Sequence, residues 1–423
     1  MVRLGRFDIE FSNPEGAYFA GQEISGKVII ENCEPKKVSE ILLELKGRGR
    51  TYWTKHSGKS RKHYSQGEPY FCEQFNTCYT HKFTTKTVSG KEERILPEGR
   101  HEVPFSYTLS KSLPSSFEGE YGYIRYTCKA ICERPWDFDI VSKRAFTVVG
   151  IEDINEDTKL LQPCSVSVSN SPVRFCCMKQ GSVSAELSVG RTGFTPGEMF
   201  YVNAKIKNDS QKTLKSSCLR VKQNVTYRAK TFAGYENVKL SSKTVCKNEQ
   251  GEVNPNSCFY WKNEKVVLPS IPPRLSSCKI IEVTYRLELD VDSVVTAAIP
   301  IHIGTIPLVS DVLARLLKSE PETDTGVQIN PDAPVQVTVT DVSGHVMSTA
   351  DSSVDNLSPE IEAIYSKRKR VRIPSSILSE LYPSLPSPYY KESHFGKVDI
   401  LDDKENVQYG EKKFAPKYPF YTD

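Results

Sequence analysis

Residues 281–291, with the sequence IEVTYRLELDV, decide the fold class of this chain. Apolar and polar side chains alternate through the whole stretch. The apolar ones are Ile281, Val283, Tyr285, Leu287, Leu289 and Val291. Successive side chains of a β-strand point to opposite faces of its sheet, so this pattern predicts a strand with one buried face and one face in water.

The same alternation recurs in both halves of the chain, at residues 41–46, 123–130, 182–189 and 200–206. No window before residue 310 shows a long apolar stripe with the 3.6-residue period of a helix. Alternating strands separated by Gly, Pro and Asn turns are typical of antiparallel β-sandwiches. We therefore predict an all-β protein.

Length and a weak internal repeat predict two domains of similar build. The chain has 423 residues, and single domains usually hold roughly 100–200. Segments 18–32 and 194–208 share one layout, in which an aromatic residue, a Gly turn and a Glu precede a strand that ends near Asn. We expect sandwiches at 1–154 and 160–310, joined by the polar hinge Glu152–Lys159.

The composition changes after residue 310. Residues 319–360 are rich in Pro, Asp, Ser, Thr and Glu, and residues 374–423 are rich in Pro and Tyr. Such sequence buries too little apolar surface to offset the entropy of the chain. We expect a disordered tail over residues 311–423, with one short amphipathic helix at its start.

Charge and hydropathy exclude several classes of protein. A net charge of +4 is small for this length, which argues against a surface built for nucleic acid. The first thirteen residues lack the apolar core of a signal peptide. The longest apolar stretch, residues 293–309, is broken by Pro and Gly and does not suit a membrane helix. We expect a cytoplasmic protein.

Neither a metal site nor a catalytic motif stands out. The twelve cysteines include no Cys-x-x-Cys pair, so we expect free thiols, no metal and no cofactor. Residues 21–27, GQEISGK, have the spacing of a phosphate-binding loop, but Val28 replaces the Mg²⁺-binding hydroxyl and a strand follows instead of a helix. We expect no enzymatic activity.

Several blocks of sequence resemble one known family. Residues 96–130, LPEGRHEVPFSYTLSKSLPSSFEGEYGYIRYTCKA, resemble the N-terminal domain of the arrestin domain-containing proteins, the α-arrestins. Residues 268–289 and 299–308 resemble the C-terminal arrestin domain of that family. The resemblance implies two immunoglobulin-like arrestin β-sandwiches, in a non-enzymatic adaptor that links membrane cargo to ubiquitin ligase and endocytic sorting machinery.

The segment Lys46–Tyr64 is basic and aromatic and contains no acidic residue. Its cations are Lys46, Arg48, Arg50, Lys55, Lys59, Arg61 and Lys62. Clustered Lys and Arg attract acidic peptides and anionic headgroups, and the resemblance favours contact with membrane-protein cargo or an anionic membrane. A solvated loop and an RNA site are the alternatives. A second basic run, Lys367–Arg370, best suits a solvated linker, with nuclear import or lipid contact as the alternatives.

The tail carries two incomplete copies of a ligase-binding motif. In α-arrestins, Pro-Pro-x-Tyr docks into WW domains of HECT-type ubiquitin ligases. Here the first copy consists of Ser387, Pro388, Tyr389 and Tyr390, and the second consists of Ala415, Pro416, Lys417 and Tyr418. WW grooves stack prolines and hold the tyrosine in a pocket, so the Pro-x-Tyr half predicts weakened binding. Unpaired tail residues or a Tyr-based sorting or phosphorylation segment are the alternatives.

The resemblance therefore implies an adaptor recruited from the cytoplasm to the plasma membrane and endosomes, with no nucleic-acid partner. A structural subunit of an endosomal sorting coat, like the retromer subunit with an arrestin fold, is the main alternative. A phosphate sensor similar to the visual and β-arrestins is a third. Its charged core has no recognisable counterpart here, and Arg125 lies on the strand face opposite Ile124 and Tyr126.

Overall fold

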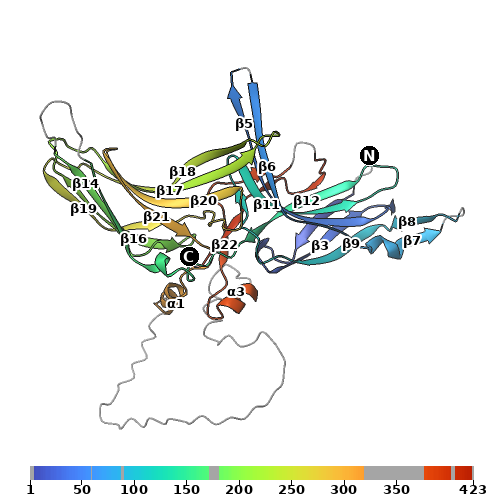
Figure 1. Ribbon diagram of the computed structural model, residues 1–423. Helices are drawn as coiled ribbons and strands as arrows, with labels where there is room; N and C mark the ends of the chain where they lie inside the picture. The colour runs from blue at the N-terminus through green and yellow to red at the C-terminus, as the bar shows by residue number, and fades with distance from the viewer. Residues whose placement is uncertain are drawn as a thin grey trace, which may run out of the picture.

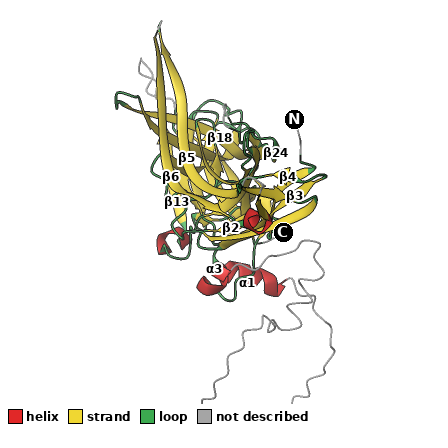
Figure 2. Ribbon diagram, turned by 90° about the vertical axis from the view of Figure 1, so that its right-hand side faces the viewer, coloured by secondary structure: helices red, strands yellow, loops and turns green. Residues whose placement is uncertain are grey.

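The computed structural model describes residues 4–58, 60–86, 90–170, 181–318, 376–401 and 405–421. Within these residues the chain forms two β-sandwiches side by side, with helices α1 and α3 on the same side of the molecule (Figures 1 and 2). The prediction of an all-β fold with two β-sandwiches is confirmed.

The first domain contains strands β1 to β12. Their bounds are Arg6–Phe11, Ala17–Phe19, Glu23–Asn32, Lys36–Lys37, Ile41–Ser57, Ser60–Asn76, Thr84–Lys86, Glu92–Leu96, Gly99–Thr108, Phe117–Glu118, Gly122–Cys132 and Ile140–Val149. One sheet has the order β1-β3-β9, and the facing sheet contains β6-β5-β11-β12 in antiparallel pairing. Aromatic rings from both sheets, including Phe11, Tyr126 and Phe146, pack edge to face or tilted between them.

The second domain contains strands β13 to β21. Their bounds are Cys164–Asn170, Val183–Val189, Gly193–Phe194, Met199–Asn208, Ser217–Lys230, Glu236–Gln250, Ser257–Val267, Ile281–Val291 and Val295–Ile303. One sheet has the order β13-β14-β16-β19, and the other contains β21-β20-β17 with β18 beside β17. Trp261 is fully buried between the sheets, where its indole N–H donates to Ser217 Oγ over 3.1 Å.

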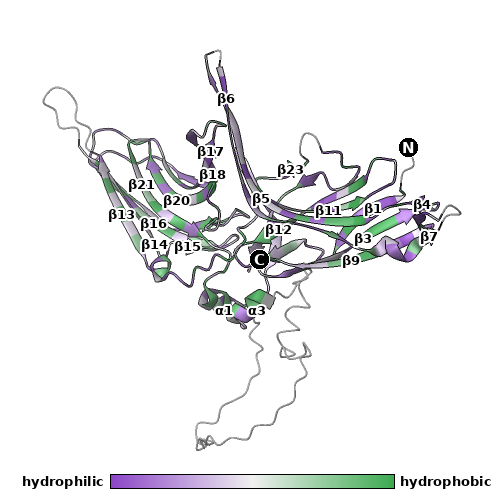
Figure 3. Cartoon of the chain, turned by 45° about the vertical axis from the view of Figure 1, so that its right-hand side comes forward, coloured by the Kyte–Doolittle hydropathy of each residue, from purple (hydrophilic) through white to green (hydrophobic). Residues whose placement is uncertain are grey.

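The alternation of apolar and polar residues determines which face of each strand is buried. Residues 281–291 form β20, and their apolar side chains are buried as the pattern predicts. In Figure 3, apolar and polar positions alternate along other strands as well. Glu288 is the exception, because it is buried although it occupies a polar position. Lys222 Nζ lies 2.8 Å from its carboxylate, and Arg220 contributes a longer ion pair.

One continuous sheet crosses from the first domain to the second, because β17 pairs with β6 at Lys230 and Ser65. Thr51 Oγ1 donates to the backbone oxygen of Arg228 over 2.7 Å. The ring of Tyr227 also packs edge to face on a tyrosine of the first domain. The two sandwiches are therefore joined by backbone pairing as well as by the hinge.

The chain end departs from the expected tail. The amphipathic helix α1, Val309–Lys318, follows β21 as expected, and residues 319–375 lie outside the described residues. Residues 376–401 and 405–421, here called the C-terminal segment, return to the body and pack against both domains. The segment contains α3 (Ser376–Leu381), β22 (Tyr389–Glu392), β23 (Val398–Asp399), β24 (Tyr409–Gly410), β25 (Lys413–Phe414) and β26 (Lys417–Phe420).

Candidate functional site

Strands β5 and β6 form a long hairpin that extends beyond the first domain (Figure 1). The neighbouring strand β11 accompanies β5 only as far as the Gly122–Thr51 pair, while β5 and β6 stay paired out to Ser57 and Ser60. Residues 52–65, here called the hairpin tip, therefore project from the sheet. An isolated hairpin is marginally stable in water, so its base needs further support.

Aromatic packing supplies that support. The rings of Trp53 and Tyr64, on opposite strands, stack with centroids 5.8 Å apart, and both residues are buried. The Tyr121 ring meets Trp53 edge to face. Cross-strand aromatic pairs stabilise a hairpin by roughly 0.2–1 kcal/mol each. The tip therefore stands on a fixed base.

The structure divides the predicted cations of segment 46–64 into two groups. Lys55, Arg61 and Lys62 are exposed at the hairpin tip. Lys46 and Arg48 are half-buried and Arg50 is exposed, all farther down β5, where the strand belongs to the sheet. Lys59 lies outside the described residues, as does the basic run 367–370. The division follows position along the hairpin, because the tip group lies beyond the Gly122–Thr51 pair, where β11 no longer accompanies β5.

The lower group lies beside a buried ion pair. Arg125 donates Nε–H and an Nη2–H to the Glu118 carboxylate at 2.8 and 2.9 Å, and both side chains are 8% exposed. Arg125 also lies over the Tyr123 ring, 4.0 Å from its centroid. Burial raises the pKa of Glu118, and Arg125 opposes that shift. The pair is a polar feature that the sequence did not reveal.

The first incomplete motif lies in the interface between the C-terminal segment and the two domains. Pro388 and Tyr389 are buried, and Ser387 and Tyr390 are half-buried. Burial raises the pKa of Tyr390 far above its ordinary value. These positions were expected on a free tail, but their rings face protein instead of water.

The second motif is buried more deeply. Pro416 is buried and Tyr418 is 0% exposed. The Tyr418 hydroxyl donates to the backbone oxygen of Ser116 in the first domain over 3.1 Å. Burial raises the pKa of Tyr418 well above its usual value. The spacing of apolar and aromatic residues at Phe414, Tyr418 and Phe420 is the signal that could have indicated this packing.

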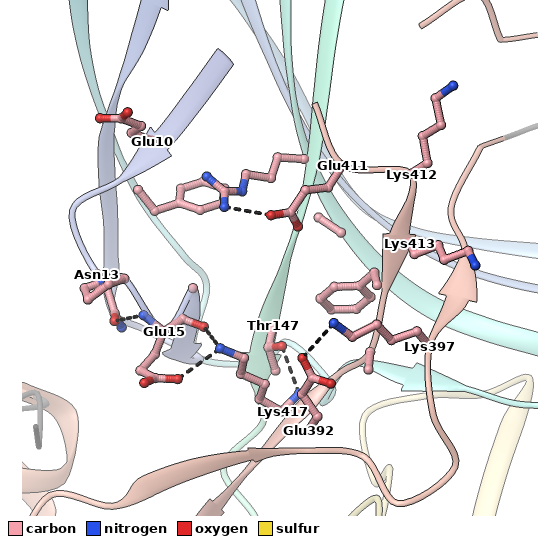
Figure 4. Close-up of a pocket in the computed structure, with 17 residues that line it drawn as sticks. Glu10, Asn13, Glu15, Thr147, Glu392, Lys397, Glu411, Lys412, Lys413 and Lys417 are labelled. Carbon is pink, nitrogen blue, oxygen red and sulfur yellow. Dashed lines mark hydrogen bonds and ion pairs between the residues drawn. The ribbon is translucent and has the colours of Figure 1, made fainter. Parts of the chain in front are cut away.

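A cleft of about 940 Å³ opens where the C-terminal segment crosses the first domain (Figure 4). Its walls carry matched charges. Lys417 Nζ lies 2.9 Å from Glu15, and Arg144 lies 2.8 Å from Glu411. The dashed contacts of Glu411 and Lys417 in Figure 4 thus join the first domain to the segment. They hold two parts of the chain together and offer no nucleophile paired with a base.

The described residues support neither a metal site nor a membrane-spanning helix. They hold no group of three His, Cys, Asp or Glu side chains that is placed to bind a metal ion. They also hold no helix whose length and apolar character would let it span a bilayer. Burial raises the pKa of the Cys128 thiol, which keeps it protonated and unreactive.

The described residues thus form two sandwiches that are joined by a continuous sheet and carry a projecting cationic hairpin. The models of the arrestin (or S-antigen) N-terminal and C-terminal domains match residues 7–155 and 179–308. The chain therefore belongs to the arrestin domain-containing proteins.

Its relatives extend this result. The chain is 58% identical, over the full length of both proteins, to arrestin domain-containing protein 17 of Caenorhabditis elegans. It is 27% identical to mouse arrestin domain-containing protein 4, over 69% of this chain and 70% of the relative. Human thioredoxin-interacting protein is 24% identical, over 67% of this chain and 69% of the relative. Proteins of this family act as adaptors that bind other proteins.

Proposed function

We propose that this protein is a non-enzymatic adaptor that binds membrane-protein cargo through the hairpin tip and links it to ubiquitin ligase and endocytic sorting machinery. The projecting hairpin carries the proposal, because it presents exposed Lys55, Arg61 and Lys62 away from the body of the protein. Clustered cations attract acidic segments of cargo and the anionic cytoplasmic leaflet. We place its action in the cytoplasm, at the plasma membrane and endosomes.

Photo-crosslinking tests the cargo contact directly. A photoreactive amino acid replaces exposed His56 at the tip, and in a matched protein it replaces exposed Lys205 on β16 of the second domain. We expect covalent adducts with integral membrane proteins from position 56 and at least threefold fewer from position 205. Adducts formed mainly with cytosolic proteins, or equal yields at both positions, would refute the cargo proposal.

Charge reversal tests whether the hairpin tip contacts lipid. The variant K55E/R61E/K62E changes the tip, and K205E/K262E/K265E makes the same charge change at exposed positions of the second domain. We expect the tip variant alone to lose sedimentation with phosphatidylserine vesicles in low salt, since each basic residue near such a surface contributes about 1 kcal/mol. Equal sedimentation of both variants would remove the membrane from the list of partners.

The ligase link rests on the two Pro-x-Tyr motifs and needs its own test. Peptides of residues 381–393 and 412–423 are titrated against a purified WW domain of a HECT-type ligase. We expect weak binding that strengthens when Ser387→Pro restores the missing proline, since WW grooves stack prolines. Binding by the restored peptide alone, with both native peptides inert, would show that this protein does not recruit such a ligase.

The packing of both motifs against the domains favours a second candidate, a structural subunit of a sorting coat. Such a subunit would need no exposed Pro-x-Tyr motif. Cargo sorting that persists after depletion of WW-domain ligases would favour the coat, whereas arrested sorting would favour the ligase adaptor.

A further inference from the structure

The ends of the two incomplete motifs lie in neighbouring strands. Strand β22 begins with Tyr389 and Tyr390 of the first motif, strand β26 begins with Lys417 and Tyr418 of the second, and the two strands run antiparallel. Tyr390 lies opposite Pro419, and Lys391 lies opposite Tyr418. Although they are 28 residues apart in sequence, the tyrosines of both motifs thus belong to one two-stranded ribbon.

The second domain holds this ribbon from one side. Ser270 Oγ donates to the backbone oxygen of Lys391 over 2.8 Å. The ring of Phe420 lies against the turn at Gly197, where a Cβ atom would stand only 2.0 Å from it. Gly197 also has a φ of +82°, a conformation that suits glycine. Any side chain at position 197 would collide with the Phe420 ring, so the glycine leaves the space that this ring occupies.

The first domain holds the ribbon from the other side. The Thr147 hydroxyl accepts the backbone N–H of Lys417 at 3.1 Å. Lys417 also reaches Glu15, and the Tyr418 hydroxyl reaches Ser116, as described above. Nearer the start of the segment, Tyr382 donates to Asp153 in the hinge over 2.7 Å. The ribbon is fixed to both sandwiches and to the segment that joins them.

An apolar cluster completes the docking of the segment. Ile377 and Leu378 of α3 are buried against residues of both domains. The cluster consists of Phe19, Val149, Ile306, Val312, Ile377, Leu378, Leu385 and Tyr421. Leu381, on the same helix, is 45% exposed and lies outside the cluster. Loss of a buried leucine removes apolar contacts and leaves a cavity, so α3 contributes strongly to docking.

WW recognition is incompatible with this arrangement. A WW groove needs an extended proline segment whose prolines and tyrosine are free to enter it. Here Pro388, Pro416 and Tyr418 are buried, and the last two residues of each motif belong to the paired strands of the ribbon. We propose that the C-terminal segment masks both ligase-binding motifs in one cooperative unit, so that a ligase binds only after the segment leaves the two domains.

This inference rests on the proposed ligase link and makes its regulation specific. A ligand that needs a minor conformation binds with its affinity reduced by the fraction of molecules in that conformation. Because each motif helps to hold the other, weakening one should expose its partner. Removal of a motif tyrosine would then increase WW binding by the remaining motif, the opposite of what two independent exposed motifs would show.

The test uses the full chain and a purified WW domain, with binding measured by calorimetry. The variant L378D loosens α3 without changing either motif, and L381D is its matched control on the same helix. We expect L378D to bind at least tenfold tighter than the native chain and L381D to bind as the native chain does. We expect Y418A, which removes one motif tyrosine, to bind tighter than the native chain as well.

Hydrogen exchange gives a readout that needs no ligase. The amides of residues 389–392, 417, 418 and 420 should be protected in the native chain and in L381D, and should lose protection together in L378D. Native binding as tight as that of the free peptides, or weaker binding by Y418A, would overturn the masking proposal while leaving ligase recruitment intact. Peptides and L378D that all fail to bind would end both proposals.

Discussion

At the scale of single residues, the fold buries a pair of opposite charges in the first domain. Arg125 and Glu118 form a bidentate pair in which both side chains are almost fully buried. Alternation correctly predicts that Arg125 lies on the strand face opposite Ile124 and Tyr126. It does not predict that a carboxylate lies within hydrogen-bond distance on that face. The partner comes from a short strand whose position depends on tertiary pairing, which local sequence does not encode.

Breaking this pair should destabilise the first domain. Arg125→Met leaves the Glu118 carboxylate buried without its partner, and such a loss typically costs about 3–5 kcal/mol. Urea denaturation followed by tryptophan fluorescence measures the change. Adding Glu118→Gln to Arg125→Met should restore much of the stability, because no isolated charge remains. A double variant as unstable as the single one would mean that packing, not charge, dominates here.

His302 should make the second domain sensitive to acid. Burial lowers its pKa below the ordinary value of 6.5, and Arg274 adds to the shift. Below pH 6.5 the unfolded chain therefore binds a proton more readily than the folded chain, so stability falls as the pH decreases through the folded pKa.

Melting temperatures of the native chain and His302→Gln, measured between pH 7.5 and 5, check this expectation. The variant should lose less stability over that range. His56→Gln at the exposed hairpin tip is the control and should follow the native curve. Identical slopes for the native chain and His302→Gln would exclude a contribution from this residue.

Elements of structure divide into those that local sequence predicts and those that need the whole fold. The alternating strands are predictable because the period of two reports directly which face is buried. The length of the β5–β6 hairpin is less visible, since its tip contains charged residues on both faces. The stacking of Trp53 on Tyr64, and of Tyr52 on His63, shows why the two strands stay together beyond the sheet.

The charged end of the hairpin tip should be dispensable for folding. Replacing residues 55–62 by Asn-Gly joins Thr54 directly to His63, its opposite residue, through a turn that suits hairpins. The deleted side chains that the structure describes are exposed. The melting temperature should change by less than about 2 °C, because surface changes usually stay within about 0.5 kcal/mol. A larger decrease would show that the tip contributes to the fold itself.

The C-terminal segment illustrates what sequence-based prediction missed. Residues 374–423 are rich in Pro and Tyr and show no sustained period, so composition indicated a tail. Their partners lie far away in the chain, as in the contacts of Tyr418 with Ser116 and of Tyr421 with Thr305. A segment without its own periodicity gains order from surfaces supplied by two other domains, which no local pattern reports.

The molecule as a whole is held at two places. A continuous sheet joins the sandwiches through β6 and β17, and the C-terminal segment bridges them on another side. The first connection is backbone pairing, and the second depends on side chains of α3, β22 and β26. The arrangement of the two domains therefore depends partly on residues more than 370 positions from the start of the chain.

Removal of the segment should leave both sandwiches folded but less stable. A chain that ends at residue 375 exposes Phe19, Val149 and Ile306, which are now buried. The melting temperature should fall by at least about 4 °C, since about 2 kcal/mol produces about 4–8 °C in domains of this size. Calorimetry checks the value, with Leu381→Asp as control. An unchanged transition would mean that the segment contributes nothing to stability.

The burial of the last aromatic residues limits where a label can be attached to the protein. Tyr421 is 3% exposed, and its hydroxyl is bonded to the backbone of the second domain. A fluorescent protein or affinity tag attached directly behind Tyr421 would therefore adjoin a buried residue and pull the final strand β26 outward. Such a label would report a protein already altered by the labelling, and imaging or pull-down work should carry its tag at the opposite terminus.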